Sequence, residues 1–400
     1  MSETKHHVDY AILGGGMAGL TVASALAPRL EEGERLVVVE PREDYGHDRT
    51  FCYWDVAPIE ADQAVKHRWK RWSVRSGGRT AVVESENYSY SYVPADAFYQ
   101  NALTNIAKHS GAEVLLQSRA LNVTDGDEQG ARVYTDKTSF DARWVFDTRP
   151  RQSLIEAAGT LQHFVGWHLR FDRPVFDETT VTLMDFDVPQ DKGLHFMYVL
   201  PFSKNEALVE STFFSPTVLE HAEYESYIRD YLCERFDVDA ETLENAEIIR
   251  VERGVVPMSP ATIVPPKNPA WHLLGTPGGF VRPATGYCFH ATGRFAVEHI
   301  DWLMKPRTNV PALRGKGLNW LDSVLLAYLD RAPEQAPDIF LRLFEHVDSD
   351  ALVRFLSNVG TPSDVLDVMR AMPVWPFVKE AMHQSFVSPT QIIEPSHVSI

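Results

Sequence analysis

Apolar and polar positions follow three patterns in turn along the chain. Up to about residue 160, short apolar runs alternate with segments of helical period, which is typical of a mostly parallel sheet covered by helices. From 163 to 257 the runs are longer, aromatic-rich and alternating, which favours a separate antiparallel sheet. From 318 to about 382 the period is helical, with breaks at Pro333, Pro337 and Pro362. The chain is therefore expected to fold into two sheets followed by a helical region.

The same patterns place the individual elements. In the first region we predict strands at 11–13, 36–39, 88–92, 113–117, 121–123, 131–135 and 144–146, and helices at 18–27 and 97–110. Asp96 is expected to cap the second of these helices and Gly111 to end it. In the second region we predict strands at 164–171, 180–185, 196–201, 207–214 and 248–257, with a helix at 217–236. A run at 270–275 and a helix at 291–304 then return the chain to the first sheet, so the second sheet is an insertion.

The turn after the first predicted strand carries a specific glycine pattern. Gly14, Gly16 and Gly19 stand at G-x-G-x-x-G spacing between a strand and a helix. Such glycines permit the tight turn, let a pyrophosphate approach the backbone and let the helix pack on the strand, while the helix N-terminus attracts the phosphates. Glu40 ends the next apolar run about 20 residues later, where an acid can accept hydrogen bonds from ribose hydroxyls. We therefore favour a dinucleotide site over a plain glycine turn.

The overall composition narrows the class of protein. Of the 400 residues, 44% are hydrophobic and 23% are charged, as in an ordinary globular protein, and the formal charge of −17 argues against nucleic acid as a partner. This charge disfavours broad docking on an anionic membrane, although a local basic patch still allows transient contact. No apolar run approaches the roughly 20 residues of a membrane-spanning helix, and the first residues lack the apolar core of a signal peptide. Three separated cysteines, Cys52, Cys233 and Cys288, fit a reducing cytoplasm and indicate no disulfide framework and no metal site.

Several further motifs, taken together, resemble those of one family. In chain order they are the glycine turn with Glu40, Arg49–Trp54 (RTFCYW), Asp147–Arg149 (DTR), Phe196–Ser203 (FMYVLPFS), Leu208–Thr212 (LVEST), Arg282–Cys288 (RPATGYC), and Leu341–Phe344 with Leu352–Leu356. In this combination the chain resembles the flavin-dependent lycopene cyclases over most of its length. The resemblance implies class α/β, with a Rossmann-like FAD-binding domain, an inserted antiparallel β-sheet substrate domain and a helical C-terminal region. The expected boundaries are 1–50, 93–160 and 266–310 for the first, 51–92 and 161–265 for the second, and 311–400 for the third.

The resemblance also implies the chemistry. FAD, active in its reduced form and reduced by NADPH, is expected beside the end of a hydrophobic polyene similar to lycopene. An acid that corresponds to Glu210 protonates the terminal double bond, and a ring closes without net redox change. The residues that correspond to the cofactor site are Gly14, Gly16, Met17, Ala18, Gly19, Glu40, Pro41, Arg49, Leu121, Asp147, Gly275, Pro283, Gly286 and Tyr287. We expect a cytoplasmic enzyme that contacts a membrane only transiently.

The surroundings of Glu210 fit the role of an acid. It lies on a predicted strand between Leu208-Val209 and Phe213-Phe214, and burial among apolar groups keeps a carboxyl protonated near neutral pH. The alternative is a solvent-facing or ion-paired glutamate on an alternating strand. The aromatic side chains that can stabilise a nearby cation are Phe196, Tyr198, Phe213 and Tyr287, although each also suits an ordinary core position.

Two positions depart from the family pattern. Ser211 stands where members usually carry a second acid beside the catalytic glutamate, which puts in doubt any mechanism that needs a carboxylate pair. Arg282 stands where members usually carry histidine, which suggests an altered substrate.

Two aromatic segments have two interpretations each. The segment Arg49–Asp55 (RTFCYWD) fits a place beneath a flavin ring and fits the core equally well. In Lys66–Arg75 (KHRWKRWSVR), Trp69 and Trp72 alternate with bases, either as a patch that meets lipid head groups or as the basic edge of a strand or helix. We favour the basic edge.

Two other functions use a similar scaffold. One is a flavin-dependent monooxygenase or halogenase, although the chain lacks the W-x-W-x-I-P of halogenases and has no G-D at Gly275–Pro277. The other is a non-enzymatic prenyl-lipid carrier, against which bound FAD would argue.

Overall fold

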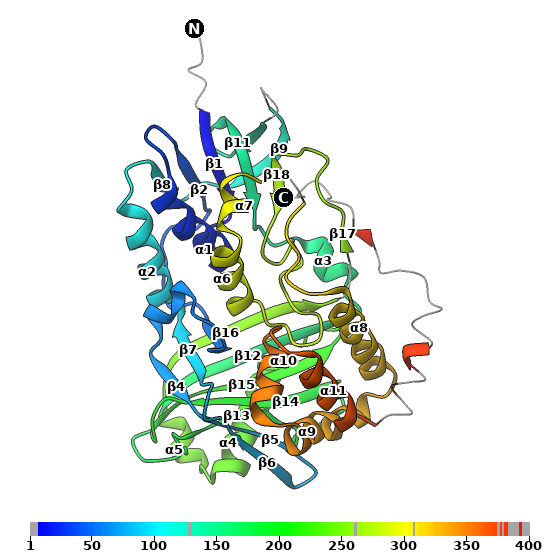
Figure 1. Ribbon diagram of the computed structural model, residues 1–400. Helices are drawn as coiled ribbons and strands as arrows, with labels where there is room; N and C mark the ends of the chain where they lie inside the picture. The colour runs from blue at the N-terminus through cyan, green and yellow to red at the C-terminus, as the bar shows by residue number, and fades with distance from the viewer. Residues whose placement is uncertain are drawn as a thin grey trace.

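The computed structural model of the chain describes residues 7–126, 130–259, 262–306, 309–373, 377, 380–382 and 392–393. Two large sheets follow one another along the length of the molecule, and the C-terminal helices lie against the sheet farther from the N-terminus (Figure 1). The predicted α/β architecture with two sheets is confirmed.

The first sheet is mostly parallel and combines segments that are distant in sequence. Its strand order is β8-β2-β1-β11-β10-β9, and β18 also pairs with β11. The strands are β1 (His7–Leu13), β2 (Leu36–Val39), β8 (Ala112–Leu115), β9 (Ala120–Asp125), β10 (Ala131–Thr135), β11 (Ser139–Asp147) and β18 (Trp271–Leu273). Because β18 pairs with β11 in parallel, the predicted return of the chain to this sheet is confirmed.

Both faces of the first sheet are covered. Helices α1 (Met17–Leu26), α2 (Ala95–Ala107) and α6 (Phe289–Glu298) pack on one face, where they share a core with Ile12 and Val38. The next residues along the strands, Leu13 and Val39, belong to the core of the other face, which β9 and β10 help to build. This double burial explains why β1 and β2 read as continuous apolar runs.

The second sheet is antiparallel except at one pair. Its strand order is β16-β12-β15-β14-β13-β5-β6, and only β13 and β5 pair in parallel. The strands are β5 (Arg71–Ser76), β6 (Arg79–Glu84), β12 (Thr160–Arg170), β13 (Thr180–Asp185), β14 (Leu194–Pro201), β15 (Glu206–Ser215) and β16 (Glu247–Met258). One face packs against α4 (His221–Phe236). The other packs against α9 (Ala336–His346), α10 (Ser349–Leu356) and α11 (Pro362–Ala371).

The remaining elements are short or lie at the edges. A three-stranded sheet contains β3 (Thr50–Trp54), β7 (Tyr90–Pro94) and β4 (His67–Trp69), and β17 (Thr262–Ile263) pairs with β19 (Ile392–Ile393). The other helices are α3 (Gln152–Ala157), α5 (Ala240–Glu244), α7 (Ile300–Met304) and α8 (Lys316–Arg331), with 3₁₀ turns η1 (Ala27–Arg29), η2 (Glu60–Ala64) and η4 (Pro333–Gln335).

Several predictions of helix boundaries were wrong. Helix α2 ends at Ala107 and not at Gly111, and the helix predicted at 217–236 begins at His221. Helix α2 begins directly after Pro94, so Asp96 lies in its first turn, where its carboxylate accepts the N–H of Ala97 at 2.8 Å instead of capping the helix. The helix predicted at 291–304 begins at Phe289 and is divided at His299, whose φ of −120° and ψ of 27° leave the helical region.

The basic segment at 66–75 forms strands, not a lipid-facing patch. It supplies β4 and most of β5, and Trp69 and Trp72 are only 2% and 1% exposed. The indole N–H of Trp69 donates to the carbonyl of Pro201 at 3.2 Å. The interfacial interpretation of these two indoles is therefore wrong. Among the described residues, no helix is both long and apolar enough to cross a membrane.

Candidate active site

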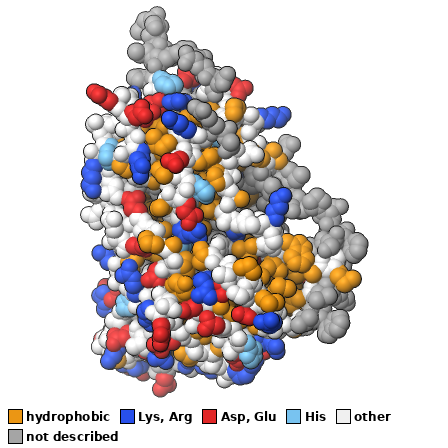
Figure 2. All heavy atoms as spheres, viewed as in Figure 1, with side chains coloured by type: hydrophobic (Ala, Val, Ile, Leu, Met, Phe, Trp, Pro, Cys, Tyr) orange, Lys and Arg blue, Asp and Glu red, His pale blue; other side chains and the backbone are white. Residues whose placement is uncertain are grey.

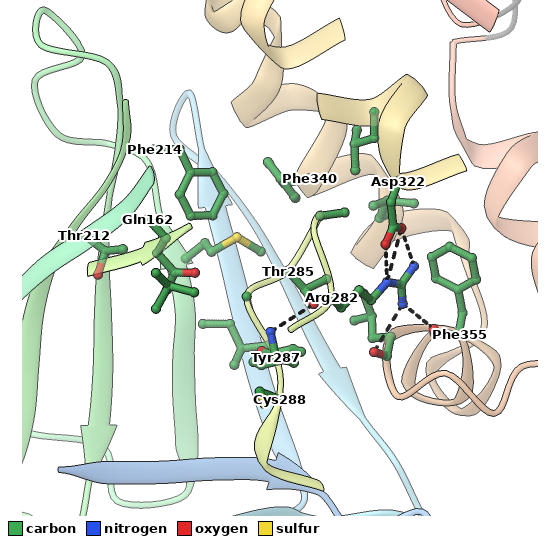
Figure 3. Close-up of a pocket in the computed structure, with 18 of the residues that line it drawn as sticks. Gln162, Thr212, Phe214, Arg282, Thr285, Tyr287, Cys288, Asp322, Phe340 and Phe355 are labelled. Atoms are coloured by element: carbon green, nitrogen blue, oxygen red, sulfur yellow. Dashed lines mark hydrogen bonds and ion pairs between the residues drawn. The ribbon is translucent and has the colours of Figure 1, made fainter. Parts of the chain in front are cut away.

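A cavity of about 760 Å³ lies between the second sheet, the turn at 282–288 and the C-terminal helices. Figure 3 shows Gln162, Thr212 and Phe214 of the sheet on one side, with Arg282 and Tyr287 of the turn across from them. The lining is mostly apolar, so the cavity suits a hydrophobic ligand.

The two ends of this cavity differ. At one end Met17 and Arg49 line it, beside the start of α1. At the other end its lining includes Trp320, Met369 and Met382, which are 43%, 50% and 60% exposed. The cavity therefore reaches the surface among apolar side chains, which gather over the C-terminal helices in Figure 2.

Glu210 lies in a row of residues that crosses four strands. On β15 it stands opposite Tyr198 of β14 and Gly166 of β12, and Gly166 in turn stands opposite Glu252 of β16. A Cβ at Gly166 would lie 2.5 Å from Cγ of Glu210, so only glycine leaves room here for the glutamate side chain. Both glutamates line the cavity, and Glu210 and Glu252 are only 7% and 6% exposed. The solvent-facing interpretation of Glu210 is therefore wrong.

The environment of the two carboxyls is asymmetric. Burial raises the pKa of Glu210 well above its ordinary value, and the charge and the hydrogen bond of Glu252 raise it further, while Arg250 acts in the opposite direction. Arg250 pairs with Glu252, and the hydroxyl of Thr50 donates to Oε2 of Glu252 at 2.9 Å. Burial thus favours the neutral form of the Glu210 carboxyl, whereas Glu252 has Arg250 and Thr50 as donors.

Ser211 does not occupy the place of a second acid in the cavity. Successive side chains of a strand point to opposite faces, so Ser211 faces α4 while Glu210 faces the cavity. Its hydroxyl lies 3.0 Å from Nε2 of His195, and its side chain is fully buried. The identity of residue 211 therefore does not decide whether the cavity holds a carboxyl pair. The second carboxyl comes from Glu252, which the sequence analysis missed although it stood on a predicted strand.

The aromatic candidates divide between the same two faces. Phe196, Tyr198 and Tyr287 line the cavity. Phe213 lies on the other face, stacked against the rings of His163 and His195 with centroid distances of 5.6 and 4.0 Å. Its proposed place beside a substrate cation was wrong, because it follows Glu210 by an odd number of residues.

Arg282 joins the late turn to the C-terminal helices. It is 1% exposed, pairs with Asp322 of α8 at 3.0 Å, and donates to the last carbonyls of α10 at Phe355 and Leu356 (Figure 3). These contacts explain an arginine at this position through packing, without reference to an altered substrate.

The glycine turn has the geometry that a dinucleotide requires. Gly14 adopts a φ of +95°, and a Cβ at Gly19 would lie 1.8 Å from the carbonyl oxygen of Gly14. A Cβ at Gly16 would meet nothing within 4 Å, so the N-terminus of α1 is open on that side. Glu40 is buried beside the turn, where its Oε2 accepts the N–H of Gly15 at 2.6 Å. These residues fit a pyrophosphate on the helix N-terminus and a ribose at Glu40.

The other predicted cofactor residues are distributed more widely. The ones that line the cavity are Met17, Arg49, Gly286 and Tyr287. A Cβ at Gly275 would lie 2.8 Å from Cβ of Ala18, so the turn around Gly275 packs directly on the start of α1. Pro283 is buried beside Arg282.

Three further predicted cofactor residues, like those of the glycine turn, are not part of the lining of the cavity. Asp147 ends β11, and its carboxylate pairs with Arg149 at 2.8 Å and with Arg151 at 3.1 Å. Leu121 lies on β9 and is 38% exposed, and Pro41 is exposed after β2. For these residues, as for all the predicted cofactor residues, a role in cofactor binding stays a prediction.

The segment Arg49–Asp55 packs in the core and also lines the cavity, and its place beneath a flavin ring stays a prediction. Phe51 stacks on Phe289 at 4.6 Å in the core under the first sheet. Phe51, Cys52 and Trp54 also line the cavity.

One protein family and several known proteins are similar to this chain in sequence. The family "Lycopene cyclase protein" matches residues 9–382. A lycopene beta-cyclase of Paracoccus sp. is 30% identical over 62% of this chain, and the match spans 59% of the length of that protein. The chloroplastic lycopene beta cyclase of Arabidopsis thaliana is 25% identical over 87% of this chain and 71% of its own. For the lycopene beta-cyclase of Pantoea ananas, the identity is 21% and the coverage is 92% and 96%.

Solved structures are similar in fold. A geranylgeranyl bacteriochlorophyll reductase-like protein of Thermoplasma acidophilum has a TM-score of 0.59 at 17% identity, covering 94% of this chain and 99% of its own. A variant of the halogenase PltM, solved in complex with FAD, has a TM-score of 0.58 at 12% identity, covering 95% and 92%. The fold is therefore a Rossmann-like, FAD-binding one, and the match over nearly the whole sequence shows that the chain belongs to the lycopene cyclase family.

Proposed function

We propose that this protein is a FAD-dependent cyclase that closes a ring at the end of a linear carotenoid or a related polyene. The observation that carries the proposal is the buried carboxyl of Glu210 in an apolar cavity that extends to the start of α1. A carboxyl kept neutral by burial can protonate a double bond, which no exposed glutamate does near neutral pH.

The cofactor in this proposal is FAD in its reduced form, with NADPH as the reductant. Its pyrophosphate would lie on the N-terminus of α1 at Gly14–Gly19, and its ribose would contact Glu40. When bound, reduced FAD supplies negative charge beside the polyene end. Arg49, Met17 and Tyr287 line the cavity where the ring system would meet the substrate.

The chain's own residues would carry the proton and shelter the cation. Glu210 gives its proton to the terminal double bond, the resulting carbocation closes a six-membered ring, and a proton then leaves the ring, so substrate and product are isomers. The faces of Tyr198, Phe196 and Tyr287 stabilise positive charge, and the apolar lining excludes water that would otherwise trap the cation.

The apolar rim of the cavity suggests how the polyene reaches the site. Trp320, Met369 and Met382 are exposed at the end that lies away from α1. A carotenoid dissolved in lipid would enter there during a transient contact with the membrane, which is compatible with the net charge of −17 because these three side chains are apolar.

The test is an anaerobic incubation of the FAD-loaded protein with lycopene in liposomes and chemically reduced flavin. A cyclised product of unchanged mass is expected, and its spectrum reports the ring. A product that contains oxygen, formed only in air, would identify a monooxygenase instead. Purified protein that neither binds FAD nor changes the polyene would identify a lipid carrier.

A further inference from the structure

We propose that Glu252 is the positioning residue that keeps the proton on Glu210, so that the acid of this site is a carboxyl pair built from two strands. The inference rests on the proposed function, because it assigns the partner of the proposed acid. It differs from a pair of adjacent acids on one strand, which the face of Ser211 rules out for this chain.

The register of the second sheet brings the pair together. Glu210 and Glu252 both stand opposite Gly166 of β12, one on each side of it. Since Gly166 has no side chain, the two carboxyls can approach each other above its backbone, and Glu252 raises the pKa of Glu210.

The partners of Glu252 decide which carboxyl holds the proton. Arg250 contacts Glu252 and also donates from Nη2 to Oγ1 of Thr50 at 2.8 Å. The hydroxyl of Thr50 in turn donates a hydrogen bond to Oε2 of Glu252. Two neighbouring carboxylates in a dry site cannot both ionise, and the one with an arginine and a hydroxyl as donors keeps the charge. Glu252 therefore accepts a hydrogen bond from the proton of Glu210, and proton release from Glu210 in the absence of substrate is disfavoured.

The other titratable groups around the pair titrate elsewhere. Burial raises the pKa of the thiol of Cys52 on β3 and of two phenols, Tyr198 on β14 and Tyr92 on β7. Burial lowers the pKa of the two imidazoles, His47 before β3 and His168 on β12. A titration at this site above pH 6.5 and below the range of the thiol and phenols therefore belongs to the carboxyl pair, with Arg250 as a positive charge beside it.

The experiment measures the protonation of Glu210 directly. In the FAD-loaded protein, infrared difference spectra taken across a pH titration record the C=O stretch of a protonated carboxyl, and the band that disappears in Glu210→Gln is assigned to Glu210. In Glu252→Gln the midpoint of that band should move to lower pH by about one unit or more, because the like charge is removed and an amide N–H now stabilises the carboxylate. In Glu252→Asp, which keeps the charge, the midpoint should stay near that of the wild type.

Cyclisation measured across the same pH range supplies the second readout. The alkaline limb of activity should move to lower pH in Glu252→Gln and be restored in Glu252→Asp. Glu247→Gln is the matched control, because Glu247 lies on the same strand and pairs with Arg170 on the exposed surface. Thermal melting and flavin absorbance show that each variant is folded and loaded.

The outcomes separate the two proposals. A Glu210 band with the same midpoint in wild type and Glu252→Gln overturns the role of Glu252, whatever the activity. A uniform loss of activity with an unshifted pH profile does the same. If the band shifts as expected but the wild type converts no polyene, the carboxyl pair stands and the proposed function fails.

Discussion

The two faces of the second sheet both bury titratable side chains, with opposite results. On the cavity face, burial raises the pKa of Glu210. On the face toward α4, burial lowers the pKa of His163 and of His195 to about 4. In each case the charged form loses its hydration, so burial favours the neutral form of all three groups.

The histidines are structural because both nitrogens of each ring are engaged. Nδ1 of His195 lies 2.9 Å from the carbonyl of Pro189, which can only accept, so Nδ1 carries the proton and Nε2 accepts from Ser211. His163 has the other tautomer.

The tautomer of His163 follows from its neighbours. Ser215 donates its hydroxyl to the carbonyl of Thr217 at 2.9 Å, so it accepts from Nε2 of His163 at 2.8 Å, and Nδ1 then accepts from Tyr224 at 2.6 Å. Glu210 differs because it faces a cavity as well as a partner. Burial makes a group neutral, and only an open neighbouring space makes that neutral group useful as an acid.

The largest expected effect is a difference in activity between variants at two adjacent positions of β15, whose side chains point to opposite faces of the sheet. Glu210→Gln keeps the shape of the side chain but provides no acidic proton, so cyclisation should fall by about 10²–10⁴-fold while FAD stays bound. The readouts are product formation and flavin absorbance. Ser211→Ala, on the opposite face, should keep nearly full activity. A Glu210→Gln protein with wild-type rates would remove the acid from the mechanism.

A second change tests the space between the carboxyls. Gly166→Ala places a methyl 2.5 Å from Cγ of Glu210, which must move, so the variant should lose about 1–3 kcal/mol of unfolding free energy. Displacing the acid by about 1 Å should also reduce cyclisation by about 10²-fold. Urea unfolding and product formation check the two effects. Gly159→Ala is the control, since a Cβ there meets nothing within 4 Å. Equal activity in both variants would contradict the close approach.

The smallest expected effect concerns His163 and His195 on the face toward α4. It changes the stability of the protein but not its activity. A histidine whose pKa falls from 6.5 to about 4 on folding stabilises the folded protein above pH 6.5 and loses that contribution as the pH drops toward 4. Between pH 7 and pH 5 each such histidine should lower the unfolding free energy by about 2 kcal/mol. His195→Asn keeps a donor for Pro189 and does not titrate, so urea unfolding should show a shallower pH dependence with activity at pH 7 unchanged. An identical slope would mean that His195 is not buried as a neutral ring.

Local patterns in the sequence were sufficient for the features that depend on near neighbours. The glycine turn, Glu40 and the apolar strand around Glu210 each follow from spacing within one or two elements. Alternation along β15 would also have placed Ser211 and Phe213 on the face away from Glu210. The pairing of Glu210 with Glu252 depends instead on the register of β15 and β16 against β12, which includes an irregularity at His168 and Leu169. Such register is set by long-range packing, so spacing in the sequence does not reveal it.

Arg282 and Asp322 form an ion pair that is almost completely buried, between the turn at the cavity and a helix of the C-terminal region. Removing one partner of such a pair leaves an uncompensated charge in the interior. Chimeras that exchange the C-terminal region between members of this family therefore have to exchange both positions together. A graft that places a neutral residue opposite Arg282 would destabilise the contact between the turn at 282–288 and the C-terminal helices, even if every cavity side chain were retained.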